Sequence, residues 1–297
     1  MFIKKSILMK YIEIIFLILL MITFKKNIKV LLCTTGKKEN LYIKEFIEHY
    51  KKYGVDKIII YDNNEKNDEY FDEVISEYIN SKFVKIINFR GRNKIQLIAM
   101  NDCYKKNYMK YDWILFYDID EFIFLKDTYN IKKFLNQRKF NKCQVIQLNW
   151  VQHTDNEKLY YENKSIFSRF NKKGKKIEKL CNIKSILRGK ISTKITSAHF
   201  INFSLNSCDG FGHKKKYINF KDINPDYNYY YIDHFYSKST EEFANKILRG
   251  SVAYGKAKRI NIIKYYFELN KITIKKINYL EKILKVNLSV FRKKIIE

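Results

Sequence analysis

Glycine and proline are scarce in this chain, whose 297 residues include nine glycines and one proline. No G-x-G-x-x-G or G-K-[ST] sequence is present, so the chain lacks the glycine-rich loops that commonly hold phosphates. The composition is neither fibrous nor typical of disorder. With 46% hydrophobic residues, the chain is long and apolar enough to bury one large core, alone or with a small appendage.

Cysteine is also limited, and its pattern is irregular. The five cysteines are widely spaced, odd in number and form no C-x-x-C pair. The sequence therefore predicts neither a disulfide framework nor a zinc site. A reducing compartment fits this pattern best.

A long uninterrupted hydrophobic run is missing as well. Near the N-terminus the fully apolar part covers only residues 14–22, whereas a membrane-spanning helix needs about 20 apolar residues. Three interpretations of residues 1–27 stay open: an anchor or span, a membrane-surface segment, or a packed helix or upstream mis-start. Residues 271–294 alternate aliphatic residues with lysine, which suits either a basic interfacial helix or an amphipathic helix packed on the core.

Positive charge, in contrast, is abundant. Lys and Arg number 58 against 31 Asp and Glu, giving a formal net charge of +27. Such an excess can indicate a nucleic acid or an anionic membrane as partner. Because the lysines are spread along the chain, we expect no nucleic-acid partner, although a basic nucleic-acid-binding protein stays open as the non-enzymatic alternative.

Strand and helix patterns alternate through the first half. Apolar strand patterns cover residues 29–35, 55–62, 82–89 and 112–118, and helical patterns cover 38–54, 67–80 (capped by Asn67) and 94–110. This alternation predicts an α/β fold with a mostly parallel central sheet flanked by helices. Ligands of such sheets bind at the carboxyl ends of the strands, where Asp62 and Asp118 fall.

The stretch DWILFYDIDEFIFL, residues 112–125, combines an apolar strand with acidic residues. In an extended chain Asp118 and Asp120 point to the same side, where their repulsion favours a cation between them. Mg²⁺ or Mn²⁺, held by one or two carboxylates and substrate phosphates, suits such a pair. In the same extended geometry Glu121 points away from both.

Three segments together resemble a known family. YIKEFIEHYKKYGVDKIIIYDN, WILFYDIDEF and YIDHFYSKSTEEFANKILRG are similar to bacterial glycosyltransferases with a family-2-like GT-A fold, close to family 92. The resemblance covers roughly residues 28–255, with 256–297 as a basic helical region. Lys38 stands where the family has Asn, and Phe46 where it has Trp. The matching residues are Glu39, Tyr42, Glu45, Asn149, Trp150, His234, Lys238, Ser239, Glu241, Glu242, Phe243, Lys246, Arg249 and Gly250.

This resemblance implies a GT-A, nucleotide-diphospho-sugar transferase fold and a metal-dependent transfer of sugar from a nucleoside-diphosphate donor, most simply a UDP-sugar. An inverting transfer is expected, and a retaining outcome stays open. The implied ligands of Mn²⁺ or Mg²⁺ are Asp118, Asp120 and His234. The catalytic candidates include Asp118 and Asp120, with Glu121 or Asp209 as alternatives for the general base. The implied donor contacts are Asp62, Glu39, Lys184, Arg188, Lys238, Lys246 and Arg249, and His199 is a further family position.

The resemblance also implies a growing glycan or lipid-linked acceptor in cell-surface polysaccharide or lipopolysaccharide synthesis. The basic ends of the chain then predict a cytoplasmic protein, attached to the cytoplasmic face of the inner membrane. A nucleotidyltransferase using the same paired aspartates is a second enzymatic alternative, although such enzymes usually carry a glycine-rich phosphate loop.

Overall fold

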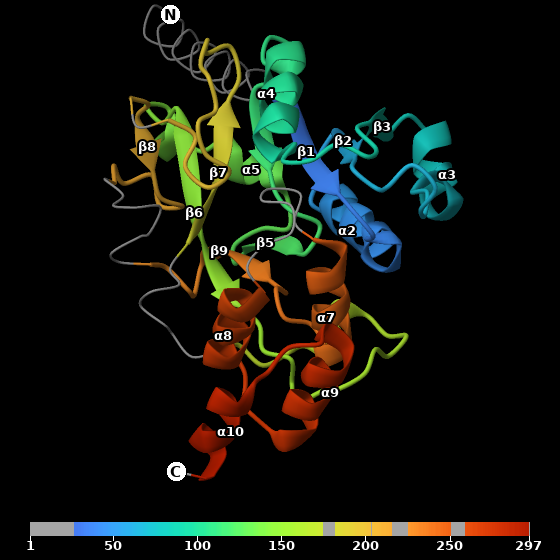
Figure 1. Ribbon diagram of the computed structural model, residues 1–297. Coiled ribbons are helices and arrows are strands. Elements are labelled where there is room, and N and C mark those ends of the chain that lie inside the picture. The colour runs from blue at the N-terminus through green and yellow to red at the C-terminus, as the bar shows by residue number, and fades with distance from the viewer. Residues whose placement is uncertain (1–26, 175–181, 203, 216–224, 251–258, 297) are drawn as a thin grey trace, which may run out of the picture.

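The computed structural model describes residues 27–174, 182–202, 204–215, 225–250 and 259–296. These residues build a central sheet of nine strands in the order β3-β2-β1-β4-β7-β6-β9-β5, with β8 paired to β6 (Figure 1). The strands are β1 (Val30–Gly36), β2 (Lys57–Asp62), β3 (Val84–Asn88), β4 (Trp113–Phe116), β5 (Glu121–Leu125), β6 (Val145–Gln152), β7 (Ile183–Arg188), β8 (Ser207–Cys208) and β9 (Tyr230–His234).

The helices are α2 (Asn40–Lys52), α3 (Asp72–Asn80), α4 (Gln96–Asn107), α5 (Ile131–Leu135), α6 (Ile166–Arg169), α7 (Thr240–Arg249), α8 (Arg259–Leu269), α9 (Ile274–Leu284) and α10 (Ser289–Ile296), with a 3₁₀ turn at Arg138–Phe140. The helix predicted from Asn67 begins later, at Asp72, after Phe71. The predicted capping role of Asn67 is therefore wrong.

Strand direction fixes which residues meet at one edge of the sheet. β1, β2, β3 and β4 pair in parallel, and β7 enters antiparallel between β4 and β6. β6 and β9 are again parallel to each other, whereas β5 is antiparallel to β9. The carboxyl ends of β1–β4, β6 and β9 and the starts of β5 and β7 therefore share one edge. The predicted α/β class with a mostly parallel sheet is confirmed.

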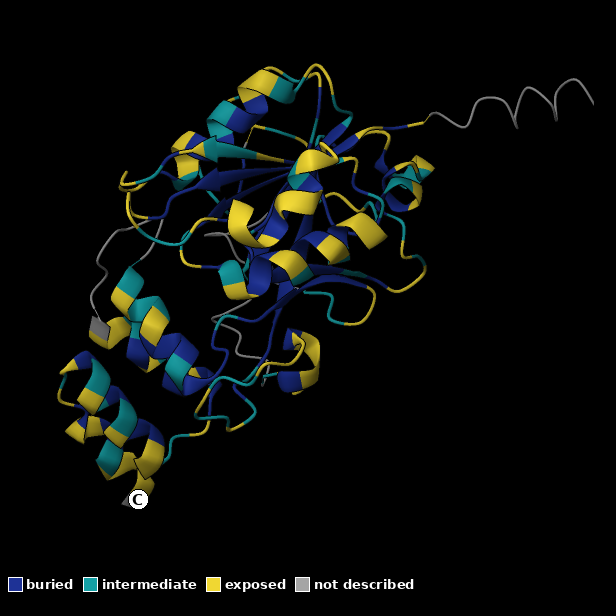
Figure 2. Cartoon of the chain, turned by 90° about the vertical axis from the view of Figure 1, so that its right-hand side faces the viewer, coloured by how far each residue is buried: buried dark blue, intermediate teal, exposed yellow. Residues whose placement is uncertain are grey.

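Alternating apolar residues on the strands bury two faces under different helices. Leu32 of β1 packs in the cluster that includes Phe46 of α2, and its neighbour Leu31 packs in the cluster that includes Met100 of α4. The strands other than the edge strand β3 are almost entirely buried, and the helices expose their outer sides (Figure 2). Continuous apolar strand sequences are thus explained by helices on both faces.

The C-terminal helices form a separate apolar cluster below the sheet in Figure 1. Ile277 and Leu280 of α9 pack there with Phe243 of α7. Residues 271–294 are not one helix, because α9 ends before Lys285, whose backbone is left-handed. The packed amphipathic alternative therefore describes α9 better than an interfacial helix does.

None of the described helices is long and apolar enough to cross a membrane. The apolar run at residues 14–22 lies outside the described residues.

The prediction that the cysteines form no disulfides is wrong. Cys33 of β1 is bonded to Cys103 of α4, and Cys143 is bonded to Cys208 of β8. Stable disulfides are typical of oxidising compartments and rare in cytosolic proteins. The two disulfides therefore argue against the predicted reducing compartment.

His49 of α2 links folding stability to pH. Its Nε2–H donates to the Ile123 carbonyl at 3.0 Å, and its ring stacks on Tyr53. Burial lowers the pKa of His49 to about 4, against about 6.5 in an unfolded chain. Between these values the unfolded state binds more protons, so His49 stabilises the fold above about pH 6.5, and this contribution is lost as the pH falls toward 4.

The free energy of unfolding of the wild type should fall as the pH is lowered from about 6.5 to 4.5. We therefore expect His49→Gln to reduce the slope of this fall by up to about 1.4 kcal/mol per pH unit. Urea unfolding of both proteins across this range measures the difference. Parallel pH profiles for wild type and variant would show that His49 titrates alike in the folded and unfolded chains.

Candidate active site

A tight turn between β4 and β5 presents the acidic residues. β4 ends at Phe116, and the Glu121 backbone N–H donates to the Asp118 carbonyl at 3.0 Å. In return, the Asp118 N–H donates to Glu121 Oε2 at 3.0 Å. The chain is therefore not extended here, and the geometry that the sequence predicted for Asp118, Asp120 and Glu121 is wrong.

The turn sends the two aspartates to different partners. Asp118 accepts from Lys184 Nζ at 2.7 Å and from Gln96 Nε2 at 3.1 Å. Asp120 lies beside Lys246, with Nζ to Oδ2 at 2.7 Å, and beside His234, with Nε2 to Oδ1 at 3.6 Å.

Among the described residues, one group of acidic and histidine side chains has spacing suited to a metal ion. Asp120, Glu121 and His234 each offer a ligand atom, and these atoms all lie within 4.8 Å of one another. Glu121 opposes His234 across the β5–β9 pair, so sheet register places the imidazole at the turn. Asp120 and His234 meet as predicted, Glu121 joins them against expectation, and Asp118 is not part of this group.

The electrostatics of this group also suit a cation. Burial and the neighbouring Asp118 and Asp120 raise the pKa of Glu121 well above its usual range, although Lys184 acts in the opposite direction. Burial would also raise the pKa of Asp120, but Lys246 and His234 outweigh it and hold that pKa well below its usual range. Glu121 Oε1 is buried without a hydrogen bond, and the nearest cation, Lys184 Nζ, is 3.3 Å away. Two carboxylates and an imidazole fit Mn²⁺ or Mg²⁺.

Cationic side chains from β7 and α7 surround the acids. Lys184 is fully buried between Asp118 and Glu121. Lys246 and Arg249 lie three apart on α7, as predicted; Lys246 binds Asp120, and Arg249 forms an ion pair with Glu39.

Lys238 precedes α7 and completes the cationic side of the site. Its Nζ lies 3.3 Å from Glu39 Oε2 and over the Tyr42 ring. Burial lowers the pKa of Lys238, and Glu39 opposes this change. These cations are therefore held in place by buried partners and do not form a solvated basic face.

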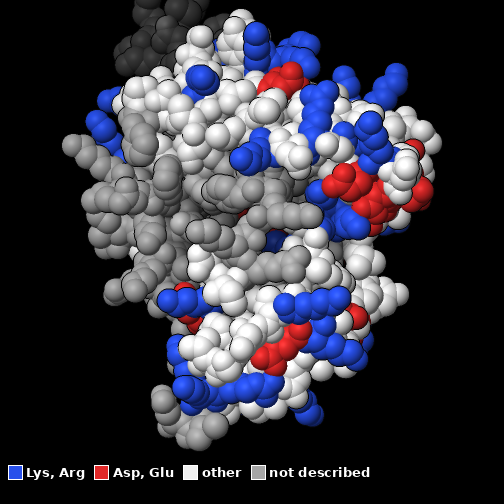
Figure 3. All heavy atoms as spheres, viewed as in Figure 1, with Lys and Arg blue, Asp and Glu red and all other residues white. Residues whose placement is uncertain are grey.

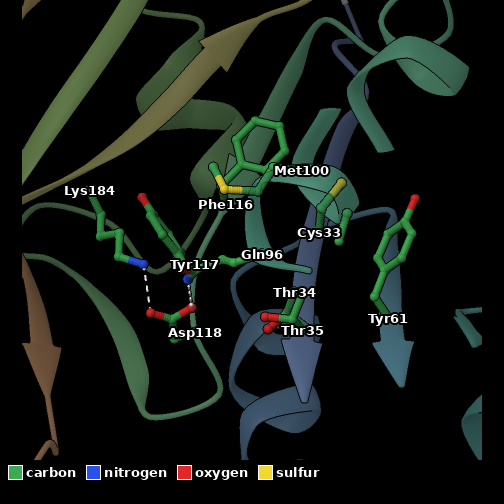
Figure 4. Close-up of a pocket in the computed structure, with 11 residues that line it drawn as sticks. Cys33, Thr34, Thr35, Tyr61, Gln96, Met100, Phe116, Tyr117, Asp118 and Lys184 are labelled. Atoms are coloured by element: carbon green, nitrogen blue, oxygen red, sulfur yellow. Dashed lines mark hydrogen bonds and ion pairs between the residues drawn. The ribbon is translucent and has the colours of Figure 1, made fainter. Parts of the chain in front are cut away.

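A pocket opens between β1, α4 and the β4–β5 turn (Figure 4). Thr34 and Thr35 at the end of β1 lie on one side, and Asp118 with its partners Lys184 and Gln96 lies on the other. The two threonine hydroxyls are buried without hydrogen-bond partners.

Unsatisfied polar groups are concentrated at the same sheet edge. Buried polar atoms rarely lack partners unless a ligand, an ion or water supplies them. The side chains at this edge with such an atom are Thr34, Thr35, Asn64, Arg90, Tyr117, Glu121, Trp150 and Gln152.

Asp62 ends β2 at this edge, as predicted. It is buried and paired with Arg90, with Nη1 to Oδ2 at 2.7 Å. It also accepts the Asn64 N–H at 2.9 Å, which fixes the turn after the strand.

Two predicted site residues lie elsewhere. Arg188 ends the antiparallel strand β7 opposite Trp113, the first residue of β4, and donates to the Cys143 and Phe140 carbonyls. It is thus at the far edge of the sheet, and its predicted phosphate contact is not supported. Asp209 follows β8 and accepts backbone N–H groups from Phe211 and His213.

The position of Asp209 does not suit a general base either. The neighbouring Gly210 packs on Tyr230, at the start of β9, whereas His234 ends that strand. Asp209 therefore caps a loop at the other end of β9.

Sequence reasoning overlooked several residues of the site. The polar pair Thr34 and Thr35 ends an otherwise apolar strand, and Gln152 follows Trp150 by two positions on the same side of β6. Trp150 itself packs on His234, with ring centroids 4.1 Å apart. The polar pair that closes an apolar strand was the available signal for the threonines, whereas β6 also carries Gln147 and Asn149, so its pattern does not single out Gln152.

Comparison with solved structures finds distant matches of low sequence identity and low TM-score. TarS 1–349 of S. aureus in complex with UDP-GlcNAc is 14% identical, covering 86% of this chain and 81% of that one, with a TM-score of 0.41. The mannosyltransferase PcManGT from Pyrobaculum calidifontis, in complex with GDP-Man and Mn²⁺, is 10% identical, covering 42% and 36%, with a TM-score of 0.32.

Sequence comparison identifies the family. A family 92 glycosyltransferase protein of Ricinus communis is 26% identical over 117 residues, which are 39% of this chain. The match spans 21% of that plant protein's length. The model of glycosyltransferase family 92 matches residues 27–273. The chain therefore belongs to glycosyltransferase family 92.

Proposed function

We propose that this protein transfers a sugar from a nucleoside-diphosphate donor to an acceptor hydroxyl, with Mn²⁺ or Mg²⁺ held by Asp120, Glu121 and His234. The observation that carries this proposal is the convergence of these three side chains at the carboxyl edge of the sheet. Buried cations and unsatisfied polar groups surround them. Asp118, which lines the adjacent pocket, is proposed to act on the ion through water or on the donor itself.

The two cations of α7 and the preceding Lys238 would bind the diphosphate. Sugar transfer leaves negative charge on the departing diphosphate, and a bound divalent ion would offset part of it. Lys246, Lys238 and Arg249 are already held by Asp120 and Glu39 on the same side of the site. Side chains fixed in advance stabilise developing charge without having to reorganise.

The nucleoside would bind at the carboxyl ends of β1 and β2, next to the pocket of Figure 4, whose volume of about 10 Å³ is enough for no more than a water molecule. Thr34, Thr35 and Gln96 offer polar groups around a wall formed by Met100 and Phe116. Asp62 is proposed to contact the base or ribose from the next strand end, and a UDP-sugar is the donor we propose. Among the predicted general bases, Glu121 is held by Lys184 and the Asp118 N–H, which favours a role in holding the ion.

The acceptor is proposed to be a glycan or lipid-linked glycan at a cell surface, with membrane attachment through the basic ends of the chain. The two disulfides favour an oxidising compartment over the cytoplasm. Lys and Arg are spread over the face in Figure 3 without forming one continuous patch, which gives no support to the nucleic-acid-binding alternative.

A donor screen tests the proposed function. Purified protein is incubated with individual nucleotide sugars, with Mn²⁺ or with a chelator, and nucleoside diphosphate release is measured. We expect release from one donor class only when the metal is present. In parallel, UDP with Mn²⁺ should raise the melting temperature, whereas stabilisation by an oligonucleotide without metal would favour the nucleic-acid binder.

A further inference from the structure

Gln152 lies against the imidazole nitrogen that faces away from the acids. It ends β6 directly opposite His234 in the β6–β9 pair. Its Nε2 lies 3.0 Å from His234 Nδ1, and both side chains are buried. Its Oε1 is buried without a hydrogen-bond partner. On β6, Trp150 also packs on the His234 ring, so the ring is confined.

The orientation of the Gln152 amide sets the position of the imidazole proton. An amide nitrogen can only donate, so Nδ1 must accept and the proton of a neutral imidazole must be on Nε2. That Nε2–H faces Asp120 Oδ1 at 3.6 Å. A nitrogen carrying this proton has no free lone pair for a metal ion.

Metal binding requires the other tautomer. A metal-ligating histidine donates its second ring N–H to an acceptor, which fixes the tautomer and the ring orientation. Rotating the Gln152 amide by half a turn exchanges its NH₂ group and its oxygen, which have nearly the same shape. The unpartnered Oε1 then accepts the Nδ1–H, and Nε2 is free to face Asp120 and Glu121.

We propose that Gln152 is a positioning residue that holds His234 in its metal-binding tautomer once the Gln152 amide oxygen faces Nδ1–H. This inference rests on the proposed function, since it concerns the same ion. A glutamine side chain can pair with either tautomer, whereas glutamate favours Nδ1–H and leucine pairs with neither. The change of tautomer moves one proton between the ring nitrogens through solvent, with no net gain or loss.

The test compares variants of Gln152 by their affinity for Mn²⁺ alone, read from the electron paramagnetic resonance signal of free Mn²⁺. Gln152→Leu should weaken binding by about 10- to 100-fold. Gln152→Glu should bind at least as tightly as wild type, because its carboxylate accepts the same proton. The matched control is Gln147→Leu, since Gln147 is also a buried glutamine on β6 but points to the other face; it should bind Mn²⁺ as wild type does.

The possible results distinguish the positioning role of Gln152 from the proposed function. Wild-type affinity in Gln152→Leu, or equal weakening in Gln152→Leu and Gln152→Glu, overturns the positioning role but leaves the proposed function standing. Absence of Mn²⁺ binding by the wild type overturns the metal site itself, and the positioning role with it. If Gln152→Leu fails to fold, Gln152→Glu decides the matter, because weaker binding in that variant contradicts the proposal.

Discussion

Asp120→Asn should reduce sugar transfer by about 1000-fold and abolish metal-dependent nucleotide binding. The substitution keeps the shape of the side chain but removes the charge that faces Lys246 and His234. Charge stabilisation by a metal ion contributes several kcal/mol to a transition state, and each 1.36 kcal/mol corresponds to a tenfold change in rate. Donor turnover and nucleotide binding measured with Mn²⁺ check this expectation.

The control for Asp120→Asn is Asp72→Asn, which removes one negative charge from an exposed position in the first turn of α3. This variant should keep wild-type turnover. Circular dichroism should show both variants folded. Unchanged turnover in folded Asp120→Asn would remove Asp120 from the site.

Arg169→Met should lower the free energy of unfolding by about 3–5 kcal/mol, because it removes one partner of a buried ion pair. Arg169 Nη1 donates to Glu242 at 2.8 and 3.0 Å, and both side chains are almost fully buried. Glu242 also accepts from Tyr42 and completes the capping box of α7 with Ser239. Without Arg169 this carboxylate remains buried on α7, the helix that also carries Lys246. Urea unfolding at neutral pH measures the loss.

Lys44→Met is the matched control for Arg169→Met. Lys44 pairs with Glu77, but both side chains are more than half exposed, and exposed pairs contribute at most about 1 kcal/mol. A similar loss of stability in the two variants would show that the buried Arg169–Glu242 pair contributes no more to the free energy of unfolding than the exposed pair does.

The sequence predicted the strands around the site because their apolar runs are continuous. β1, β2 and β4 each lie under helices on both faces, so no polar residue interrupts them. Polar residues appear only where these strands end, which is why Asp62 and Asp118 marked the correct edge. His234 and the α7 cations were found through family motifs, and no periodicity in the sequence points to them.

The remaining details depend on contacts between distant segments. The position of Glu121 follows from a turn, and the alternation of side chains along an extended strand does not predict that turn. Cys33 and Cys103 are separated by 70 residues, and their bond depends on how α4 packs on β1. Arg188 lies at the edge of the sheet opposite the site, because β7 runs antiparallel to β4. The sequence of β7 does not reveal this direction.

The central claim is that one ion joins the β4–β5 turn to the end of β9. Mn²⁺ titrations in the presence of UDP, with wild type, His234→Ala and His153→Ala, test it most directly. His153 is a matched control, because it is also buried but its ring pairs with Asp233 at 2.6 Å and does not belong to the group of Asp120, Glu121 and His234. Both variants should lose stability, but only His234→Ala should weaken Mn²⁺ and UDP binding together in the folded fraction. Equal Mn²⁺ affinity in all three proteins would contradict the claim and remove His234 from the site.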